Sequence, residues 1–149
     1  MSDNRQRNEI NDRMCRSLIR AATEAMKFAY TPYSGFKVGA ALLSSDSGVY
    51  TGCNIENAAY GPTNCAERTA FFKAVSAGVT SFNAIAIVGG KDGVITELCP
   101  PCGVCRQVMM EFCKADEFLV ILARSEDDYR VCSLEELLPM GFGAANLKG

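Results

Sequence analysis

The sequence predicts an α/β protein in which one mixed five-stranded sheet carries helices on both faces. The chain has 149 residues, enough for one domain with a real hydrophobic core. Hydrophobic residues make up 48% of it and charged residues 21%, the proportions of an ordinary globular protein. Segments with helical and strand patterns alternate without repeats or a dividing linker, so residues 1–149 are expected to form a single three-layer α/β/α domain.

The first part of the chain is expected to form a helix followed by a hairpin. Apolar residues recur about every fourth position over residues 9–29, and Thr31-Pro32 then stops the helix. Phe36–Leu43 and Val49–Cys53 have the composition of strands. Because only a short polar turn separates them, we expect the two strands to pair in antiparallel fashion.

The remainder of the chain alternates helices with strands of the buried type. In chain order, the expected elements are a helix over Cys65–Ala77 closed by Gly78, a strand over Phe82–Val88, a loop over Gly89–Pro101, a helix over Gly103–Lys114, strands over Phe118–Ala123 and Tyr129–Cys132, and a short helix from Ser133 to Leu138. A helix connects the third strand to the fourth, so these two strands are expected to be parallel, with a right-handed crossover.

Composition excludes several classes of function. The chain has no His, which removes every mechanism that needs a histidine base, nucleophile or metal ligand. A formal net charge of −2 argues against a partner that is a nucleic-acid polymer. Met1–Gln6 are polar, and no run approaches the ~18 consecutive apolar residues of a membrane span. We therefore expect a cytoplasmic protein without membrane association.

The eight cysteines fall into one cluster and several isolated positions. Cys99, Cys102 and Cys105 lie within seven residues, a spacing that favours a metal or redox site over a disulfide framework. The role of Cys99 in this cluster is open. Isolated cysteines usually behave as small buried hydrophobic residues, which is what we expect of Cys15, Cys53, Cys113 and Cys132.

Three of the cysteines are expected to meet on one metal ion. Cys65 and Cys102 each begin a helix that follows a strand, so both lie on the same rim of the sheet, with Cys105 one turn further along. Three thiolates with one open position suit a catalytic Zn²⁺. Their excess negative charge would be offset by the helix N-termini and by Arg68. Glu67 is close enough to exchange protons with metal-activated water.

Other interpretations of the cysteine cluster remain open from spacing alone. A CxxC pair is also typical of thioredoxin-like redox sites, and three regularly spaced cysteines resemble part of an iron–sulfur motif. The strongest alternative is a closed structural zinc site in which Cys99 is a fourth ligand. Against it, Pro100-Pro101 separates Cys99 from the helix start, and a closed site leaves Glu67 and Arg68 without a role.

The chain resembles the small homotetrameric cytidine deaminases, whose motifs match those of zinc nucleobase deaminases. The resemblance runs from about residue 17 to residue 143. Its motifs are Tyr33-Ser34, Phe36–Leu42 (FKVGAAL), Gly52–Ala58 (GCNIENA), Cys65–Ala70 (CAERTA), Pro101–Gln107 (PCGVCRQ) and Glu136–Pro139 (ELLP). It implies the three-layer cytidine-deaminase-like fold.

The resemblance implies roles for the residues of the metal centre. Cys65, Cys102 and Cys105 match the ligands of one Zn²⁺ per subunit, and Glu67 matches the proton-transfer residue. Arg68 matches a residue that moderates the charge of the ligands.

The resemblance also implies a set of residues that bind the substrate. Asn54 and Glu56 match the pair that holds the ribose hydroxyl, Phe36 the aromatic wall beside the base, and Phe142 an aromatic residue that a neighbouring subunit contributes. From composition alone, Asn54 and Glu56 could also belong to a polar turn. Phe36 and Phe142 could equally be residues of the hydrophobic core. The other residues implied to bind substrate are Ile55, Asn57, Ala58, Ala59, Tyr60 and Ala66.

The implied activity is hydrolytic deamination of cytidine and deoxycytidine to uridine and deoxyuridine plus ammonia, in pyrimidine salvage. The implied partners are a nucleoside substrate and further copies of the chain in a homotetramer. Two alternatives remain: a deaminase of the same fold for a nucleoside antibiotic of the blasticidin type, and a non-catalytic zinc module.

Overall fold

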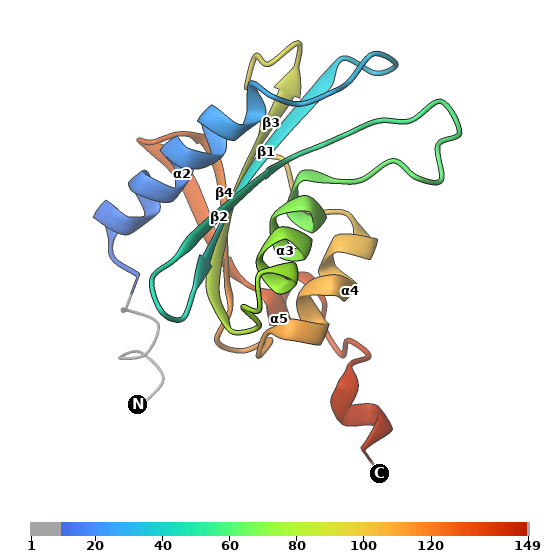
Figure 1. Cartoon of the computed structure of the whole chain (residues 1–149). Coiled ribbons are helices and arrows are strands. Elements are labelled where there is room, and N and C mark those ends of the chain that lie inside the picture. Colours follow the sequence, from blue (N-terminus) through green and yellow to red (C-terminus); the bar gives the residue numbers. More distant parts are fainter. Residues whose placement is uncertain (1–9, 149) are drawn as a thin grey trace.

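A computed structural model describes residues 10–148, in which helices cover both faces of a five-stranded sheet (Figure 1). The strands are β1 (Phe36–Ser44), β2 (Val49–Cys53), β3 (Phe82–Lys91), β4 (Leu119–Ser125) and β5 (Asp128–Ser133). The helices are α2 (Asp12–Met26), α3 (Ala66–Ser76), α4 (Gly103–Phe112), α5 (Leu134–Leu137) and the 3₁₀ turn η1 (Ala144–Leu147). The predicted α/β fold class is confirmed.

The order of strands in the sheet is β2-β1-β3-β4-β5. As predicted, β1 and β2 form an antiparallel hairpin, and β3 and β4 are parallel, joined through α4. The pairs β1–β3 and β4–β5 are antiparallel. Both α3 and α4 begin after a strand has ended at the same edge of the sheet, so their N-termini lie near each other.

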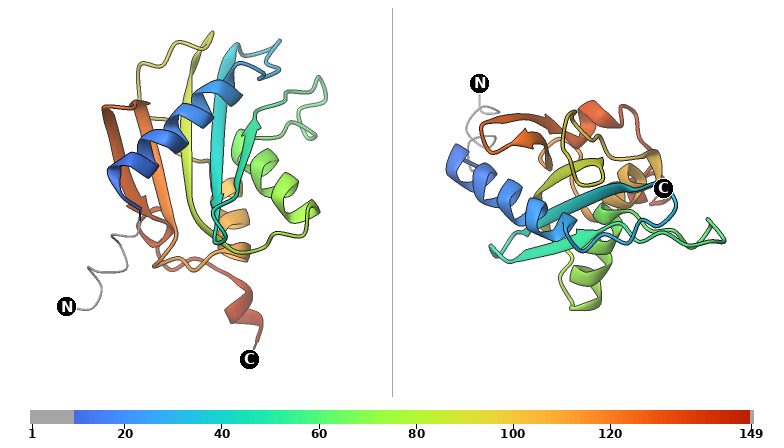
Figure 2. Two further views of the ribbon diagram at one scale, coloured as in Figure 1. Left: turned by 60° about the vertical axis from the view of Figure 1, so that its left-hand side comes forward. Right: turned by 90° about the horizontal axis from the view of Figure 1, so that it is seen from above.

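Helices lie on both faces of the sheet (Figure 2), and each face carries its own hydrophobic core. Helix α2 covers one face, where Ile19 packs among strand residues such as Ala86. Helices α3, α4 and α5 cover the other face, where Phe71 and Met109 pack with Ile87. Burying a large apolar side chain contributes about 1.5–3 kcal/mol. Strand residues alternate between the two cores, which is why the buried strands have continuous apolar runs.

Two glycines allow helices to lie directly on the strands. A Cβ atom at Gly39 of β1 would lie 2.0 Å from the carbonyl oxygen of Ala22 in α2. A Cβ atom at Gly52 of β2 would lie 2.4 Å from the carbonyl oxygen of Ala66 in α3. Any side chain at Gly52 would therefore push away the start of α3, which carries the candidate site.

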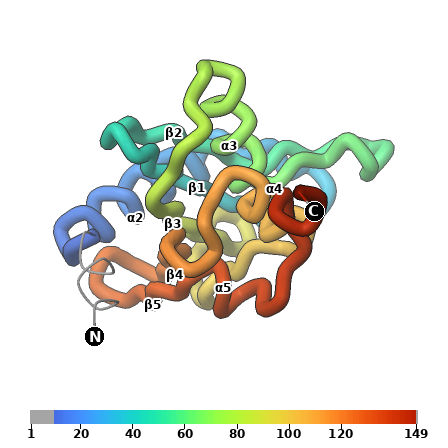
Figure 3. The backbone as a smooth tube through the Cα atoms, turned by 90° about the horizontal axis from the view of Figure 1, so that it is seen from below, coloured from blue at the N-terminus to red at the C-terminus, as the bar shows by residue number. Residues whose placement is uncertain are grey.

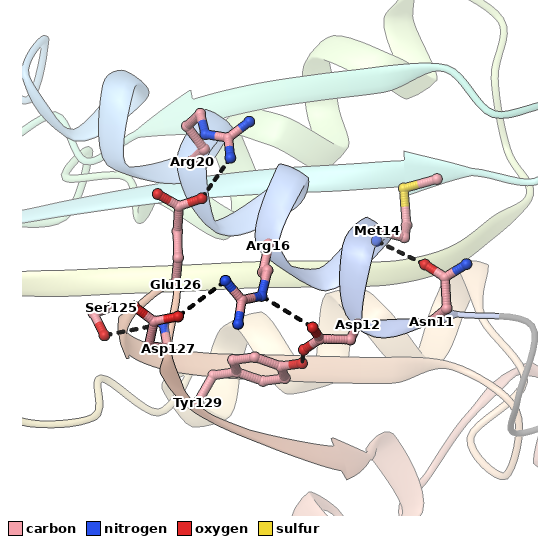
Figure 4. Close-up of polar contacts among 9 residues, drawn as sticks. All are labelled: Asn11, Asp12, Met14, Arg16, Arg20, Ser125, Glu126, Asp127 and Tyr129. Atoms are coloured by element: carbon pink, nitrogen blue, oxygen red, sulfur yellow. Dashed lines mark hydrogen bonds and ion pairs between the residues drawn. The ribbon is translucent and has the colours of Figure 1, made fainter.

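Exposed polar contacts join α2 to the turn between β4 and β5 (Figure 4). Arg16 Nη1 lies 2.9 Å from Asp127 Oδ1, and Tyr129 donates its hydroxyl hydrogen to Asp12. Exposed ion pairs contribute little stability each, so α2 is held on the sheet mainly by its buried apolar face. The other contacts drawn join Arg20 with Glu126, Arg16 with Asp12, Asn11 with Met14, and Ser125 with Asp127.

The first helix is shorter than predicted. The pattern predicted residues 9–29, whereas α2 spans Asp12–Met26, and the predicted start at residue 9 lies outside the described residues. The helix ends early because the backbone of Tyr30 pairs elsewhere. Its N–H donates to the Asn54 carbonyl at 3.0 Å, and its own carbonyl accepts from the Glu56 N–H at 2.9 Å.

Later elements also differ from the prediction, most clearly at the ends of β3 and α4. Strand β3 runs to Lys91 because Lys91 pairs with Phe36 of β1, so the loop predicted from Gly89 begins three residues later. Helix α4 ends at Phe112, where Cys113 turns to an extended conformation. The 3₁₀ turn η1 was not predicted.

Among residues 10–148, no helix has the length and apolar character to span a membrane.

Candidate functional site

Three thiols meet where α3 and α4 begin. Cys65 and Cys102 are the N-cap residues of these helices, both in extended backbone conformation, and Cys105 lies in the first turn of α4. Within the described residues, only these three Cys, Asp or Glu side chains form a group whose ligand atoms all lie within 4.8 Å of one another. The predicted meeting of the two helix starts on one rim is confirmed.

The distances between the sulfur atoms fit a tetrahedral metal site. Cys65 Sγ lies 3.8 Å from Cys102 Sγ, which lies 3.5 Å from Cys105 Sγ. A Zn–S bond of about 2.3 Å in a tetrahedral site places sulfur atoms about 3.8 Å apart. These separations are far longer than a disulfide bond, which measures about 2.05 Å. The three side chains therefore suit Zn²⁺, and Cys102 is exposed to solvent, whereas Cys105 is buried.

Arg68 lies beside the thiols and counters their negative charge. Its Nη2–H donates to Cys65 Sγ at 3.2 Å, from the next turn of α3. A hydrogen bond with the Cys105 thiol, together with Arg68, lowers the pKa of Cys65 to about 5. The same hydrogen bond raises the pKa of Cys105. The Nε of Arg68 is buried and has no hydrogen-bond partner among the described residues, so one donor of the guanidinium lacks an acceptor there.

Glu67 is the buried carboxyl group of the site. Its side chain is only 4% exposed, in the first turn of α3, and burial raises its pKa to about 7. The charge of the neighbouring Cys65 acts in the same direction. A carboxyl group with such a pKa can both accept and donate a proton near neutrality.

Cys99 lies apart from the three grouped thiols. Its Sγ packs toward β3, where a Cβ atom added at Gly89 would lie 2.9 Å from it. Burial raises the pKa of Cys99 to about 11, which favours the neutral thiol. The position of Cys99 against the apolar core disfavours the closed four-cysteine alternative.

Asn54 holds the start of β1 with both groups of its side-chain amide. Its Nδ2 donates to the Phe36 carbonyl at 2.8 Å, and its Oδ1 accepts from the Val38 N–H, also at 2.8 Å. These bonds fix Phe36, whose side chain is 41% exposed. The alternative that Phe36 is a core residue is therefore wrong. Asn54 retains one N–H and one acceptor site for a ligand.

Glu56 is oriented by the turn that precedes β1. Its Oε1 accepts from the backbone N–H groups of Tyr33 and Ser34, at 3.0 and 3.1 Å. The Ser34 hydroxyl donates to Oε2 at 2.5 Å and lowers the pKa of Glu56. The carboxylate is thus held ionised and in a fixed direction, with acceptor capacity left for a hydroxyl group.

A cavity of about 370 Å³ lies between this turn and the segment that follows β2. A larger hollow at the opposite end of the sheet, around Ser45 and Phe82, contains none of the candidate residues. Of the implied substrate-binding stretch, Ile55, Ala58 and Ala59 are exposed but do not line the smaller cavity. That cavity is lined by Tyr33, Ser34, Glu56, Asn57, Tyr60 and Thr63.

Two implied substrate residues differ from the others in their surroundings. The side chain of Ala66 is fully buried, so only its backbone can reach a ligand. Phe142, like Phe36 and Asn54, does not line the smaller cavity, and it differs from them in lying on the segment after α5, where it is 57% exposed. Core packing is therefore excluded for Phe142 in this chain as it stands alone.

Sequence reasoning missed two hydroxyl side chains that build this region. Ser34 orients Glu56, and Thr63 accepts a hydrogen bond from the Asn57 N–H at 3.0 Å through its Oγ1. The resemblance did include Ser34 in a motif, but no role was assigned to it. No pattern pointed to Thr63, because a hydroxyl in a polar loop has no distinctive spacing.

Comparison with known proteins identifies the family. Residues 13–121 match the family model described as the cytidine and deoxycytidylate deaminase zinc-binding region. The chain therefore belongs to this family of zinc-binding deaminases, and the zinc cofactor expected from the thiol group is confirmed.

Individual relatives agree with this assignment. A cytidine deaminase of Sporosarcina psychrophila is 50% identical over 130 residues, which is 87% of this chain and 92% of that protein. A probable cytidine deaminase of Dictyostelium discoideum is 41% identical over 93% of this chain and 90% of its own. The crystal structure of a cytidine deaminase from Burkholderia pseudomallei is 50% identical, with a TM-score of 0.77 over 85% of this chain and 97% of that one.

Proposed function

We propose that this chain is a single-domain enzyme that deaminates cytidine and deoxycytidine by hydrolysis, giving uridine or deoxyuridine and ammonia in pyrimidine salvage. The observation that carries the proposal is the grouping of three thiols with the buried carboxyl group of Glu67 at one edge of the sheet. Family membership supports the same reaction class.

Cys65, Cys102 and Cys105 would hold one zinc ion per subunit. When bound, zinc supplies the Lewis acidity that makes water nucleophilic at neutral pH. Arg68 offsets the negative charge of the thiolates through its bond to Cys65 Sγ, and the N-termini of α3 and α4 add partial positive charge.

Glu67 would move the protons of the reaction. Its carboxylate accepts a proton from the attacking water and donates it to the ring nitrogen N3, which activates C4 toward attack. The same carboxyl group then takes the proton of the hydroxyl added at C4 and delivers it to the departing amine, so the products are the C4 carbonyl of the uracil ring and ammonia. Burial of Glu67 keeps bulk water from competing for these protons.

Asn54 and Glu56 would hold the sugar. Glu56 is presented toward the cavity as a fixed carboxylate, which suits a charge-assisted hydrogen bond from a ribose hydroxyl. Phe36, with its half-exposed ring, would lie beside the base. The stretch Ile55–Tyr60 would supply the remaining contacts, and Ala66 would contribute its backbone.

A substrate panel tests this proposal. Loss of ultraviolet absorbance is expected with cytidine and deoxycytidine. For free cytosine, kcat/KM should fall by roughly 100-fold or more, because two hydrogen bonds to the sugar are missing, one of them charge-assisted. Turnover restricted to a blasticidin-type antibiotic would mean a different substrate. A folded, zinc-loaded chain inactive on every compound would be a non-catalytic zinc module.

The proposed assembly is a homotetramer in which Phe142 completes the site of a neighbouring subunit. The support is the exposed ring of Phe142 beside Gly141 and Gly143, together with exposed apolar side chains such as Phe28 and Met140. Light scattering should give a mass four times that of the 16.1 kDa subunit. A mass near one subunit would contradict this assembly.

We also propose the cytoplasm as the compartment. All eight cysteines, which lie within residues 10–148, are free thiols, as expected in a reducing environment. The small net charge of −2 supports a small-molecule substrate and not a nucleic-acid polymer.

A further inference from the structure

The segment after α5, residues 138–147, leaves the body of the protein along α4; we name it the C-terminal arm (Figure 3). Leu138, at its start, packs partly against the core, whereas the large apolar side chains beyond it are exposed: Met140 fully, Leu147 by 77% and Phe142 by 57%. Met140 also has a positive φ of 53°. Within one subunit, the arm beyond Leu138 therefore obtains little of its order from hydrophobic burial, and other contacts must set its direction.

Two consecutive side chains of α4 hold the arm. Gln107 donates from Nε2 to the carbonyl oxygen of Phe142 at 2.8 Å. Arg106 donates from Nη1 to the carbonyl oxygen of Leu137, directly before the arm, at 2.5 Å. One turn further along α4, Met110 lies against Gly143, where an added Cβ atom would be 3.1 Å from its Cε. The arm is thus fixed at its start and at Phe142.

The same stretch of α4 fixes the candidate zinc ligands. Arg106 donates from Nε to the carbonyl oxygen of Pro101, which precedes Cys102, at 2.8 Å. Its backbone N–H donates to the carbonyl oxygen of Cys102 at 3.0 Å. Arg106 and Gln107 directly follow Cys105 in sequence. One side chain, Arg106, therefore spans from the ligand turn to the base of the arm.

We propose that Arg106 and Gln107 are positioning residues that couple the zinc-ligand turn at Cys102 to the C-terminal arm and so fix the direction of the exposed Phe142 ring. The coupling works because order in the first turn of α4 sets where both side chains point. Its importance for turnover rests on the proposed function, in which Phe142 enters a neighbouring site. The physical coupling itself does not depend on the substrate.

Hydrogen exchange of residues 138–147 measures the coupling directly. The Gln107→Glu side chain has nearly the same shape as glutamine but no N–H to donate. In the zinc-loaded variant, amide hydrogen exchange in the arm should therefore become roughly fivefold faster, which is the effect of losing one hydrogen bond. Gln107→Lys retains a donor of similar reach and should stay close to the parent. Glu111→Ala, on the same helix without a hydrogen bond to the arm, is the matched control and should leave the arm unchanged.

A tryptophan reporter gives a second readout. The chain contains no Trp, so Phe142→Trp introduces a single one in the arm. Chelation of zinc should increase acrylamide quenching of this Trp, and Gln107→Glu should produce a similar increase while zinc content stays at the parent level. A quenching constant that does not respond to chelation, or arm exchange in Gln107→Glu equal to that in Glu111→Ala, overturns the proposal.

Kinetics separate positioning from general stabilisation. In the protein that retains Phe142, Gln107→Glu should raise KM for cytidine roughly fivefold and leave kcat within about twofold of the parent value. The reason is that the arm affects substrate binding and not proton transfer. A variant with a lower melting temperature but the parental KM would mean a merely structural Gln107. If the parent enzyme fails to deaminate cytidine while the arm still responds to zinc, the proposed function fails and the coupling stands.

Discussion

Replacing Glu67 by Gln should lower kcat for cytidine on the order of 10²- to 10⁴-fold, the usual contribution of a positioned acid–base group. The amide has almost the same volume as the carboxyl group, so the buried position in α3 can accommodate it. It cannot accept and then release a proton. Initial rates measured by loss of cytidine absorbance check this result.

Zinc content and the far-ultraviolet circular dichroism spectrum of Glu67→Gln serve as controls, and both should match the parent protein. The carboxyl group is not among the three grouped ligands, so its loss leaves the thiols intact. Near-normal turnover in this variant would remove Glu67 from the mechanism and leave the protons to another group.

Cys102→Ala should bind zinc only substoichiometrically and lose activity with it. Two thiolates remain in that variant, and they leave two positions of the tetrahedral site to water. Cys99→Ala is the matched control, three residues earlier in the same loop, and it should keep both zinc and turnover. Metal analysis of the purified proteins, combined with the absorbance assay, measures both effects.

The reverse result, with zinc lost in Cys99→Ala and kept in Cys102→Ala, would mean that Cys99 and not Cys102 is a zinc ligand. The present choice rests on sulfur positions: Cys102 Sγ lies 3.5 Å from Cys105 Sγ, whereas Cys99 packs against Gly89. Loss of zinc in both variants would point to a closed four-cysteine site.

Elements governed by local signals were predicted closely. The bounds of β2, Val49–Cys53, agree with the prediction because a polar turn precedes the strand. Ser133 caps α5 as expected, accepting a hydrogen bond from the Glu136 N–H at 3.2 Å. The thiol site was also predictable, because helix starts after neighbouring strands must meet at one edge of a sheet.

Features set by contacts between distant segments were not predictable. The apolar pattern of the first helix continues to Ala29, which is buried, yet the helix ends at Met26 because Tyr30 pairs with residues 54–56. Likewise, Ser34 is bound to Glu56 across 22 positions of sequence. Such contacts between distant segments produce no periodic pattern in the sequence of either segment.

The bonds of Asn54 affect how mutagenesis of this protein must be interpreted. Its amide joins the backbone of Phe36 and Val38, so any replacement releases Phe36 at the same time as it removes a group that we propose to face the sugar. A higher KM in Asn54→Ala therefore combines two losses. In a double-mutant cycle with Phe36→Ala, the two effects should be markedly non-additive. An alanine scan based on KM would classify Asn54 as a substrate-binding residue even if its only role were to hold the start of β1.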